Sequence, residues 1–309
     1  LAHSRPQDLV FEKLEQRLYE IIFTIAALNR IALHYPIEIM VVNDDVKAAS
    51  KAAVLWAKDR GIPSLHLTHG LTISIPYTVH SKVMADKLAI FGERGAEPYL
   101  DLGISPQRMA ITGNPAWDGY AFLRKRRSDI CRQLGAKHGF SADKPLVVFG
   151  TTWTADLTAF SNPHVYERSV SALFAAFREL HAAGRNYVFV VKDRPPNAAF
   201  GVDLVRQLAS NVGIGPKDYV YDVGPPELWV AAADVVVSLD SNLSVEAILA
   251  GVPAVNLWDD TGILFGPSFG AEDAIVHCWP EQLASNLMLI VEDEKYRAYF
   301  LPRTYAIYI

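Results

Sequence analysis

The sequence predicts an α/β protein of two domains, each a parallel β-sheet flanked by helices. Three observations carry this prediction. Short apolar runs typical of buried strands alternate with helical patterns along most of the chain. The alternation occurs in two series, separated by a charged segment at residues 125–144. The length of 309 residues is sufficient for two domains and long for one.

The first series starts with a long helix, expected over residues 8–34, where apolar residues recur at helical spacing. Residues 19–33 are strongly apolar, but Glu20 and Arg30 interrupt them, so a buried helix is expected rather than a membrane span. Further helices are expected over residues 47–60 and 92–102. Strands are expected at residues 37–42, 64–67, 87–91 and 108–112.

The second series has five expected strands, at residues 146–149, 187–191, 219–221, 235–238 and 254–257. Helices are expected over residues 163–183, 203–211, 226–233, 245–250 and 280–292, with a further candidate at the end of the chain. We therefore expect an N-terminal domain over residues 1–124, a linker over residues 125–144 and a C-terminal domain over residues 145–309.

The composition is that of a globular protein that does not bind nucleic acid. Apolar residues make up 50% of the chain and charged residues 20%, and the formal net charge is −5. One basic run, residues 124–127, is interpreted as a solvated helix end or linker. The alternative is contact with an anionic acceptor or with the inner face of the membrane.

Cys131 and Cys278 have no second thiol or histidine at metal-ligand spacing, so free thiols in a reducing, cytoplasmic compartment are expected. The sequence shows no signal peptide and no metal-binding pattern such as HxxxH, HxH or Asp-x-Asp. The chain starts at Leu1 rather than Met, which is compatible with a piece of a longer protein that has other domains.

Polar clusters follow the predicted strands, where open parallel sheets bind ligands. His69 and Gly70 follow the second strand. The histidine is a candidate general base, since its ordinary pKa is near neutrality, or it is a satisfied loop histidine. Asp44 and Asp45 end the first strand and are candidate bases or partners of His69; alternatively, they cap the next helix.

Two more clusters surround the expected linker. Asn114 and Asp118 belong to a Gly-Asn-Pro turn that either lines a cleft or only begins a helix. Thr151 and Thr152 follow the first strand of the second series, where hydroxyls and free N–H groups suit a phosphate. The Gly-Lys-Ser ending of a P-loop is absent there.

Lys192 and Arg194 follow the next strand, and two prolines come directly after them. Two cations at this position suit a diphosphate or an anionic sugar. The alternative is a solvated turn in which Asp193 pairs locally.

The most specific cluster contains three serines, Ser238, Ser241 and Ser244, at a strand-to-helix junction. Their hydroxyls and the helix N-terminus favour phosphate oxygens. Glu246 follows in the same helix and is suited to accept hydrogen bonds from both hydroxyls of a ribose. Alternatively, it complements the helix dipole or completes a capping box.

Taken in order, these motifs resemble the GT-B glycosyltransferases, over roughly residues 43–256. The most similar groups are the CDP-glycerol glycerophosphotransferase-like and the capsule or lipopolysaccharide transferases of bacteria, and the related UDP-N-acetylglucosamine 2-epimerases. The resemblance is carried by His69-Gly70, Gly113-Asn114-Pro115 with Asp118, Ser241 to Glu246 with Ala247, and Gly251-Val252-Pro253.

The resemblance implies two Rossmann-like domains with a cleft between them, the acceptor domain first and the nucleotide-donor domain second, with no obligatory metal. It implies that His69 acts as base and that Ser241, Ser244 and Glu246 hold the nucleotide. It also implies that the last helix, residues 294–309, packs back towards the first domain. Such N-terminal domains usually have more strands before the His-Gly strand than this chain shows.

Many relatives with CMP- or CDP-linked donors carry Lys-x-His-Pro where this chain has Lys192-Asp193-Arg194-Pro195. A permanent cation therefore replaces a titratable group. Arg194 remains suited to neutralise the leaving phosphate, but the general-acid role of the histidine is not expected here.

The leading interpretation is a glycosyltransferase that moves a sugar from a CMP-, CDP- or UDP-linked donor to a bacterial surface polysaccharide or glycolipid, without a metal or other cofactor. One alternative is a nucleotide-sugar 2-epimerase, for which Asp44, Asp45, Asp118 and His69 are the candidate acids and bases. The other is a nucleotide-binding domain of a larger protein without catalysis.

Overall fold

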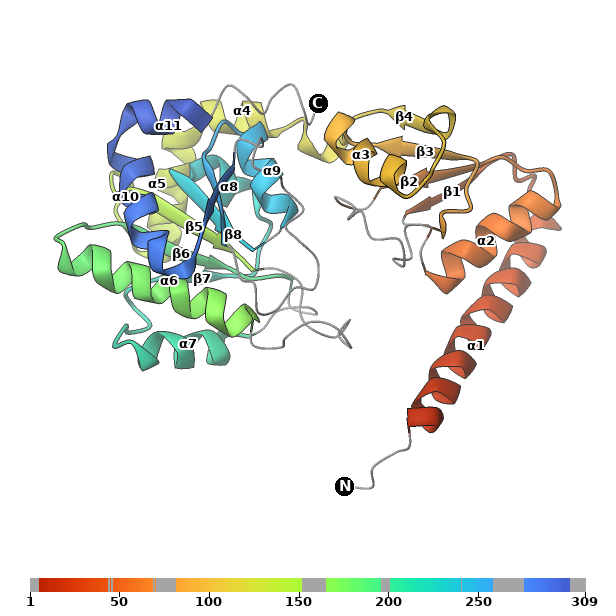
Figure 1. Cartoon of the computed structure of the whole chain (residues 1–309), viewed down its shortest axis with the longest axis horizontal. Coiled ribbons are helices and arrows are strands. Elements are labelled where there is room, and N and C mark those ends of the chain that lie inside the picture. The colour runs from red at the N-terminus through yellow and green to blue at the C-terminus, as the bar shows by residue number, and fades with distance from the viewer. Residues whose placement is uncertain are drawn as a thin grey trace. The chain divides into compact units, whose positions relative to one another are not determined.

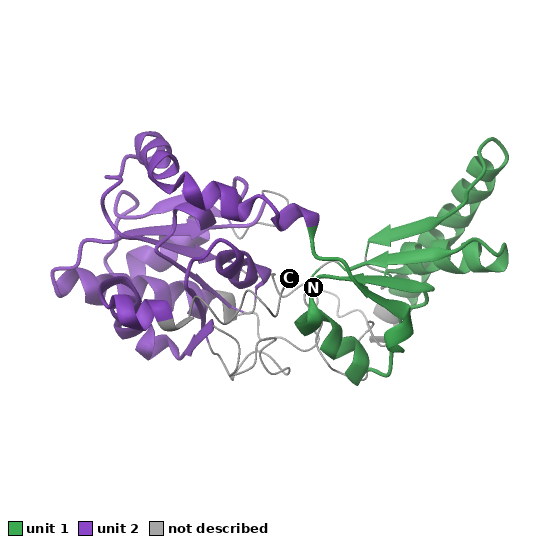
Figure 2. Cartoon of the chain, turned by 90° about the horizontal axis from the view of Figure 1, so that it is seen from above, with its two compact units in different colours: residues 1–114, 308–309 green, residues 115–307 purple. Residues whose placement is uncertain are grey.

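The fold was analysed in a computed structural model of the chain (Figure 1). The structure describes residues 6–43, 45, 47–68, 70, 82–151, 165–195, 201–239, 241–257 and 275–300. These residues form two compact units that divide between Asn114 and Pro115 (Figure 2). Each unit has its own parallel sheet, as expected for two Rossmann-like domains.

The first unit is built on a four-stranded parallel sheet with the strand order β1-β2-β3-β4. Parallel neighbours require crossover connections, and two of the helices lie in such connections. The strands are β1 (Met40–Asn43), β2 (Ser64–Leu67), β3 (Lys87–Ile90) and β4 (Met109–Ile111). The helices are α1 (Pro6–Ala32), α2 (Ala48–Asp59), α3 (Glu93–Asp101) and the 3-10 turn η2 (Pro106–Arg108).

The core of the first unit lies on one face of this sheet. Met40 and Val42 are two positions apart on β1, and Leu88 and Ile90 are two positions apart on β3. In this register all four side chains point to the same side of the sheet. Apolar residues of α2 and Tyr99 of α3 complete the cluster. The strands are thereby packed against a layer of helices.

Helix α1 forms where it was expected, but the prediction that residues 19–33 are buried is wrong. Its main neighbour is α2, where Trp56 Nε1 donates to Asn29 Oδ1 at 2.8 Å. Phe23 and Leu33 are 72% and 81% exposed. A helix that packs along one side buries only that stripe, so its apolar composition overestimates its burial. No described helix is both long and apolar enough to cross a membrane.

The second unit contains a six-stranded parallel sheet with the order β10-β9-β8-β5-β6-β7. Counted from β5, this is the order 3-2-1-4-5-6 of a doubly wound Rossmann sheet. The chain direction across the sheet reverses between β5 and β8, which is its topological switch point. The strands are β5 (Leu146–Gly150), β6 (Val188–Lys192), β7 (Val220–Asp222), β8 (Val235–Ser238), β9 (Ala254–Leu257) and β10 (Ile275–Cys278).

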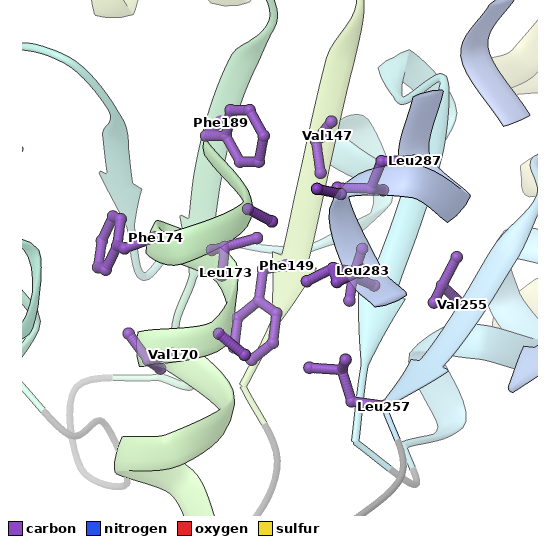
Figure 3. Packing of buried hydrophobic residues seen from close by; sticks show 14 of the residues in the cluster. Val147, Phe149, Val170, Leu173, Phe174, Phe189, Val255, Leu257, Leu283 and Leu287 are labelled. Atoms are coloured by element: carbon purple, nitrogen blue, oxygen red, sulfur yellow. The ribbon is translucent and has the colours of Figure 1, made fainter. Parts of the chain in front are cut away.

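Helices surround this second sheet. They are α4 (Tyr120–Lys125), α5 (Arg127–His138), α6 (Val165–Ala182), α7 (Val202–Asn211), α8 (Glu227–Ala232), α9 (Asn242–Leu249), α10 (Leu283–Glu292) and α11 (Glu294–Phe300), with 3-10 turns η3 (Pro115–Trp117) and η5 (Pro280–Gln282). Figure 3 shows the core between α6, α10 and the sheet, where Phe149 of β5 and Leu173 of α6 are fully buried. The strands are buried along their length, as parallel strands between helical layers are.

The segment expected to be a linker is structured instead. Residues 125–144 contain the end of α4 and the whole of α5, and both helices contact α8 in the second unit. The unit boundary lies earlier, between Asn114 and Pro115. The charge of this segment suggested a solvated connection, whereas its apolar residues, among them Ile130 and Leu134, are buried.

Part of the basic run is used inside the second unit. Arg124 Nη1 donates to the carbonyls of Ala231 and Ala233, both at 2.9 Å. Arg127 Nη2 donates to Asp234 Oδ2 at 2.6 Å. The last carbonyls of a helix have no partner within it, and these arginines therefore cap the C-terminal end of α8. The interpretation of the whole run as solvated is therefore wrong for two of its four residues.

The last helix and the two cysteines were also the subject of predictions from the sequence. Helix α11, the first part of the expected helix over residues 294–309, packs against α10. Residues 301–309 lie outside the described part, so the return of this helix towards the first domain stays a prediction. Cys131 and Cys278 are buried free thiols, and burial raises the pKa of Cys278 to about 12.

Candidate nucleotide-binding pocket

The second unit has a pocket of about 400 Å³ at the carboxyl ends of its central strands. In doubly wound sheets, ligands bind at this edge next to the switch point. The pocket is lined by residues that follow β5, β6 and β7 and by the start of α9: Gly150, Thr151, Lys192, Asp193, Arg194, Pro195, Val223, Gly224, Pro225, Pro226, Ser241, Asn242, Leu243 and Glu246. Five predicted binding residues therefore meet here: Thr151, Lys192, Arg194, Ser241 and Glu246.

Gly150 allows the first turn of α9 to approach the end of β5. A Cβ at position 150 would lie 2.1 Å from Leu243 Cδ2, which is far inside van der Waals contact. Only glycine leaves this space open. The close approach places the N-terminus of α9 at the wall of the pocket.

Helix α9 begins at Asn242, three residues before the expected start, and Ser241 is its N-cap. The Ser241 hydroxyl accepts a hydrogen bond from Leu243 N at 3.3 Å, and Ser244 N donates to the Ser241 carbonyl at 3.0 Å. The N-terminus of a helix favours anions through its N–H groups and its dipole. The pocket therefore has a wall that suits phosphate oxygens.

Ser238 and Ser244 do not line the pocket, although they were predicted to contact the donor. Both are fully buried, and their hydroxyls are 2.7 Å apart. The pair joins the end of β8 to the first turn of α9. This hydrogen bond stabilises the junction in the core, outside the pocket lining.

Lys192 supplies a buried cation to the pocket. Its side chain is 5% exposed, and its ammonium donates to the carbonyl of Asp193. Burial lowers the pKa of Lys192, and the carboxylates of Asp222, Asp193 and Glu227 oppose this shift. A second cation, the half-buried Arg194, lies two residues further on. Two cations beside a helix N-terminus give this side of the pocket a field that favours anions.

A local pair of Asp193 was the alternative interpretation of this turn, and the side chain has several partners. Its Oδ1 accepts hydrogen bonds from Thr151 Oγ1 and from Arg194 N, both at 2.8 Å. Its Oδ2 accepts from Tyr221 Oη at 2.8 Å and from Gly201 N at 3.3 Å. Asp193 thus fixes the ends of β5, β6 and β7 relative to one another and sets the shape of the pocket.

A turn after β7 forms a largely apolar wall of the pocket. Asp222 Oδ2 accepts hydrogen bonds from Gly224 N at 3.0 Å and from Trp229 Nε1 at 2.9 Å. These bonds connect the turn to α8. Pro225 and Pro226 follow and stiffen it. Sequence reasoning missed this wall, although the rule that ligands bind beyond strand ends points to it.

Glu246 brings a carboxylate to the pocket from α9. The Tyr120 hydroxyl donates to its Oε2, and the Trp117 indole donates to the same carboxylate. Burial raises the pKa of Glu246 and the nearby Glu227 raises it further, whereas the hydrogen bonds from Tyr120 and Trp117 lower it. The pocket therefore contains a hydrogen-bond acceptor as well as the two cations.

Asp45 has a structural position in the first unit. Its side chain is fully buried, and its Oδ2 accepts hydrogen bonds from Met84 N at 2.5 Å and from Ala85 N at 2.9 Å. Lys51 forms an ion pair with Oδ1 at 3.8 Å. The expected cap of the next helix is wrong, because the N-cap of α2 is Lys47. Asp45 instead ties the segment before β3 to the end of β1.

The other predicted residues are placed as follows. Gly70 and Asn114 belong to the first unit and are half-buried, and Asp118 is exposed in the second unit. Asp44, His69 and Thr152 lie outside the described residues. Gly113 adopts a φ of 71°, which explains the glycine at the turn before Asn114. Among the described residues, no group of three or more His, Cys, Asp or Glu side chains is placed to hold a metal ion.

Comparison with solved structures identifies the class of fold. The chain has the GT-B-like fold of two Rossmann-like domains that is shared by UDP-N-acetylglucosamine 2-epimerases and glycosyltransferases. No protein-family model and no curated protein sequence matches it.

Three solved structures illustrate the likeness. A putative UDP-N-acetylglucosamine 2-epimerase from Listeria monocytogenes has a TM-score of 0.66 at 18% identity, over 96% of this chain and 74% of that one. The UDP-GlcNAc 2-epimerase of Neisseria meningitidis, solved bound to UDP-GlcNAc, has a TM-score of 0.66 at 16% identity, over 94% and 77%. A glycosyltransferase from Rickettsia africae has a TM-score of 0.56 at 14% identity, over 99% and 79%. At these identities the likeness defines the fold.

Proposed function

We propose that this protein is a nucleotide-sugar enzyme and that its second unit binds the nucleotide of the donor. The observation that carries the proposal is the pocket at the switch point, which combines two cations, a helix N-terminus and a carboxylate. Lys192, Arg194 and the start of α9 would bind the phosphates, and Glu246 would accept the ribose hydroxyls. The wall from Val223 to Pro226 would pack against the base.

As the reaction, we propose transfer of the sugar to a hydroxyl of a bacterial surface polysaccharide or glycolipid. Transfer requires stabilisation of the negative charge that develops on the leaving phosphate, and Lys192, Arg194 and the N-terminus of α9 are suited to supply it. It also requires removal of the acceptor proton. His69 remains the proposed general base for that step, since a neutral imidazole needs no large pKa shift.

A second candidate reaction is 2-epimerisation of a nucleotide sugar. The likeness to UDP-N-acetylglucosamine 2-epimerases supports it. The same nucleotide pocket would serve both reactions, because they differ only in what happens to the sugar. An epimerase needs no acceptor, so the two candidates separate in a single incubation. A nucleotide-binding unit without catalysis is the third outcome.

The test begins with nucleotide binding. CMP, CDP, UDP and GDP are added separately to the whole chain, and the melting temperature is measured, because a ligand specific for the folded state raises it. Glu246→Ala should weaken the selected nucleotide by about 1.5–3 kcal/mol in calorimetry. Glu292→Ala is the matched control: it removes a partly exposed carboxylate of the same unit that pairs with Arg185 and does not line the pocket.

The reaction is then assigned with the sugar conjugate of the selected nucleotide. Conversion of UDP-N-acetylglucosamine alone to its 2-epimer supports the epimerase, and release of nucleotide only when a glycan acceptor is present supports the transferase. If none of the four nucleotides changes the melting temperature or binds in calorimetry, the proposed function is wrong.

A further inference from the structure

Glu246 is a buried carboxylate whose hydrogen-bond donors are neutral side chains. The groups that act on it are two neutral donors, Tyr120 and Trp117, and one like charge, Glu227. Burial favours the neutral form of a carboxyl group. Hydrogen bonds donated to the carboxylate favour the charged form. The charge of Glu246 therefore depends on its two donors.

Both donors come from a segment that does not line the pocket. Trp117 ends η3 and Tyr120 begins α4, and Tyr120 is 126 positions away from Glu246 in the sequence. Tyr120 is 2% exposed, so packing fixes its ring and directs its hydroxyl at Oε2. Helix α4 also contacts α9, which carries Glu246. The donors thus reach the carboxylate from behind the pocket.

The number of acceptor positions leaves room for a ligand. A carboxylate has about four lone-pair positions. Tyr120 and Trp117 use two of them. Two acceptor positions therefore remain on Glu246, which lines the pocket. This equals the number of free hydroxyls on the ribose of a nucleotide. A carboxylate held by two fixed donors also loses little side-chain entropy when it binds.

We propose that Tyr120, assisted by Trp117, is a positioning residue that keeps Glu246 ionised and aimed at the ribose, and thereby sets the preference for ribonucleotides over 2′-deoxyribonucleotides. The inference rests on the proposed function, because it requires a nucleotide in this pocket. It adds a specificity-determining role for residues outside the pocket lining.

The test compares UDP with 2′-deoxy-UDP on the whole chain by calorimetry, or the matching pair of whichever nucleotide the thermal screen selects. Tyr120→Phe keeps the ring and removes the hydroxyl. We expect UDP to bind about tenfold more weakly to this variant, in line with the loss of one charge-assisted hydrogen bond. The affinity for 2′-deoxy-UDP falls less, so the ratio of the UDP affinity to the 2′-deoxy-UDP affinity decreases by roughly threefold or more.

A pH profile provides a readout that a loss of packing would not change. Glu227 from α8 faces Glu246, and Lys192 and Arg194 line the same pocket, so these groups remain the same in wild type and variant. Removing the Tyr120 hydroxyl takes away a bond that lowers the pKa of Glu246. In a plot of UDP affinity against pH, the loss of affinity at acidic pH should therefore begin at a higher pH in Tyr120→Phe than in wild type.

Two controls separate positioning from stability. Tyr187→Phe removes another tyrosine–glutamate bond of the same unit, from Tyr187 Oη to Glu292 Oε1 at 2.7 Å, and should leave both affinities unchanged. In a Glu246→Gln background, Tyr120→Phe should no longer narrow the ratio, as a double-mutant cycle requires of coupled residues. If Tyr120→Phe does not fold, Trp117→Phe takes its place in the same measurements.

The outcomes distinguish the inference from the proposed function. If wild type binds UDP and Tyr120→Phe shows the same ribose preference and the same loss of affinity at acidic pH, the inference is wrong and the proposed function stands. If wild type binds none of the four nucleotides, the proposed function fails, and the inference fails with it.

Discussion

Gly150 and Leu243 meet at the switch point of the second sheet, with 2.1 Å between the position of a Cβ on the glycine and Cδ2 of the leucine. The contact joins the end of β5 to the first turn of α9. Any side chain at position 150 must therefore displace Leu243, which is itself buried.

The first prediction follows from this contact. Gly150→Val should reduce the free energy of unfolding by about 1–3 kcal/mol, the usual cost of overpacking, and should weaken nucleotide binding because α9 shifts. Calorimetric unfolding and nucleotide titration measure the two effects. Gly119→Ala is the control, since nothing lies within 4 Å of its Cβ position and its φ is −74°. Equal stability of the two variants would contradict the close approach.

The second prediction concerns the buried charge of Glu246. Burial raises the pKa of this carboxyl above its ordinary value, so the folded protein binds the proton more tightly than the unfolded chain. Stability is then fullest at acidic pH and falls as the pH rises from the ordinary pKa of glutamate through the raised one. Glu246→Gln cannot ionise and avoids this loss.

Glu246→Gln should therefore melt at a higher temperature than wild type at pH 7, and the difference should shrink towards pH 4, while nucleotide binding is weakened. Melting curves from pH 4 to pH 8 check this. Glu292→Gln is the control, because Glu292 pairs with Arg185 at 2.7 Å and its replacement should not stabilise the fold. A Gln variant that is less stable than wild type at pH 7 would refute the argument.

The third prediction assigns Asp45 to the fold of the first unit. Asp45→Ala removes the acceptor of the Met84 and Ala85 N–H groups. Loss of the acceptor for the buried Ala85 N–H alone costs about 1–3 kcal/mol. The melting temperature should fall by several degrees. Asp59→Ala, which removes an acid that is 80% exposed on α2, should change it little. Asp45→Ala with wild-type stability and lost turnover would instead support the role of a base.

The fourth prediction divides the basic run by function. Arg124→Ala removes the donor to two terminal carbonyls of α8 and should destabilise the second unit by about 1–3 kcal/mol. Arg126→Ala, an exposed neighbour in the same run, should change stability by less than about 0.5 kcal/mol. Denaturant unfolding compares them. A larger effect from Arg126 would show that the run serves another purpose, which anionic vesicles would then test.

Local patterns were sufficient to predict much of the second unit. The serines before α9 and the cations after β6 were recognised from neighbours in sequence and from the rule that ligands bind beyond strand ends. The strand at β10 was not predicted, because four residues with one histidine carry a weak signal. The partners of Asp193 were also missed, since they come from β5, β7 and the start of α7, and only the folded sheet brings these together.

Burial was the least predictable property. Ser238 and Ser244 are of a residue type that often binds ligands, yet they form a hydrogen bond with each other inside the core. Helix α1 has the composition of a core helix, yet much of its apolar surface is exposed. Tyr120 had no recognisable signal, because its role depends on a glutamate that is 126 positions away. In each case the deciding contact comes from tertiary packing, which no local pattern contains.

All fourteen described residues around the pocket belong to the unit that begins at Pro115. The six-stranded sheet, its helices and these residues therefore make up one module. An exchange of everything before Pro115 would alter the preceding unit without replacing any of the fourteen.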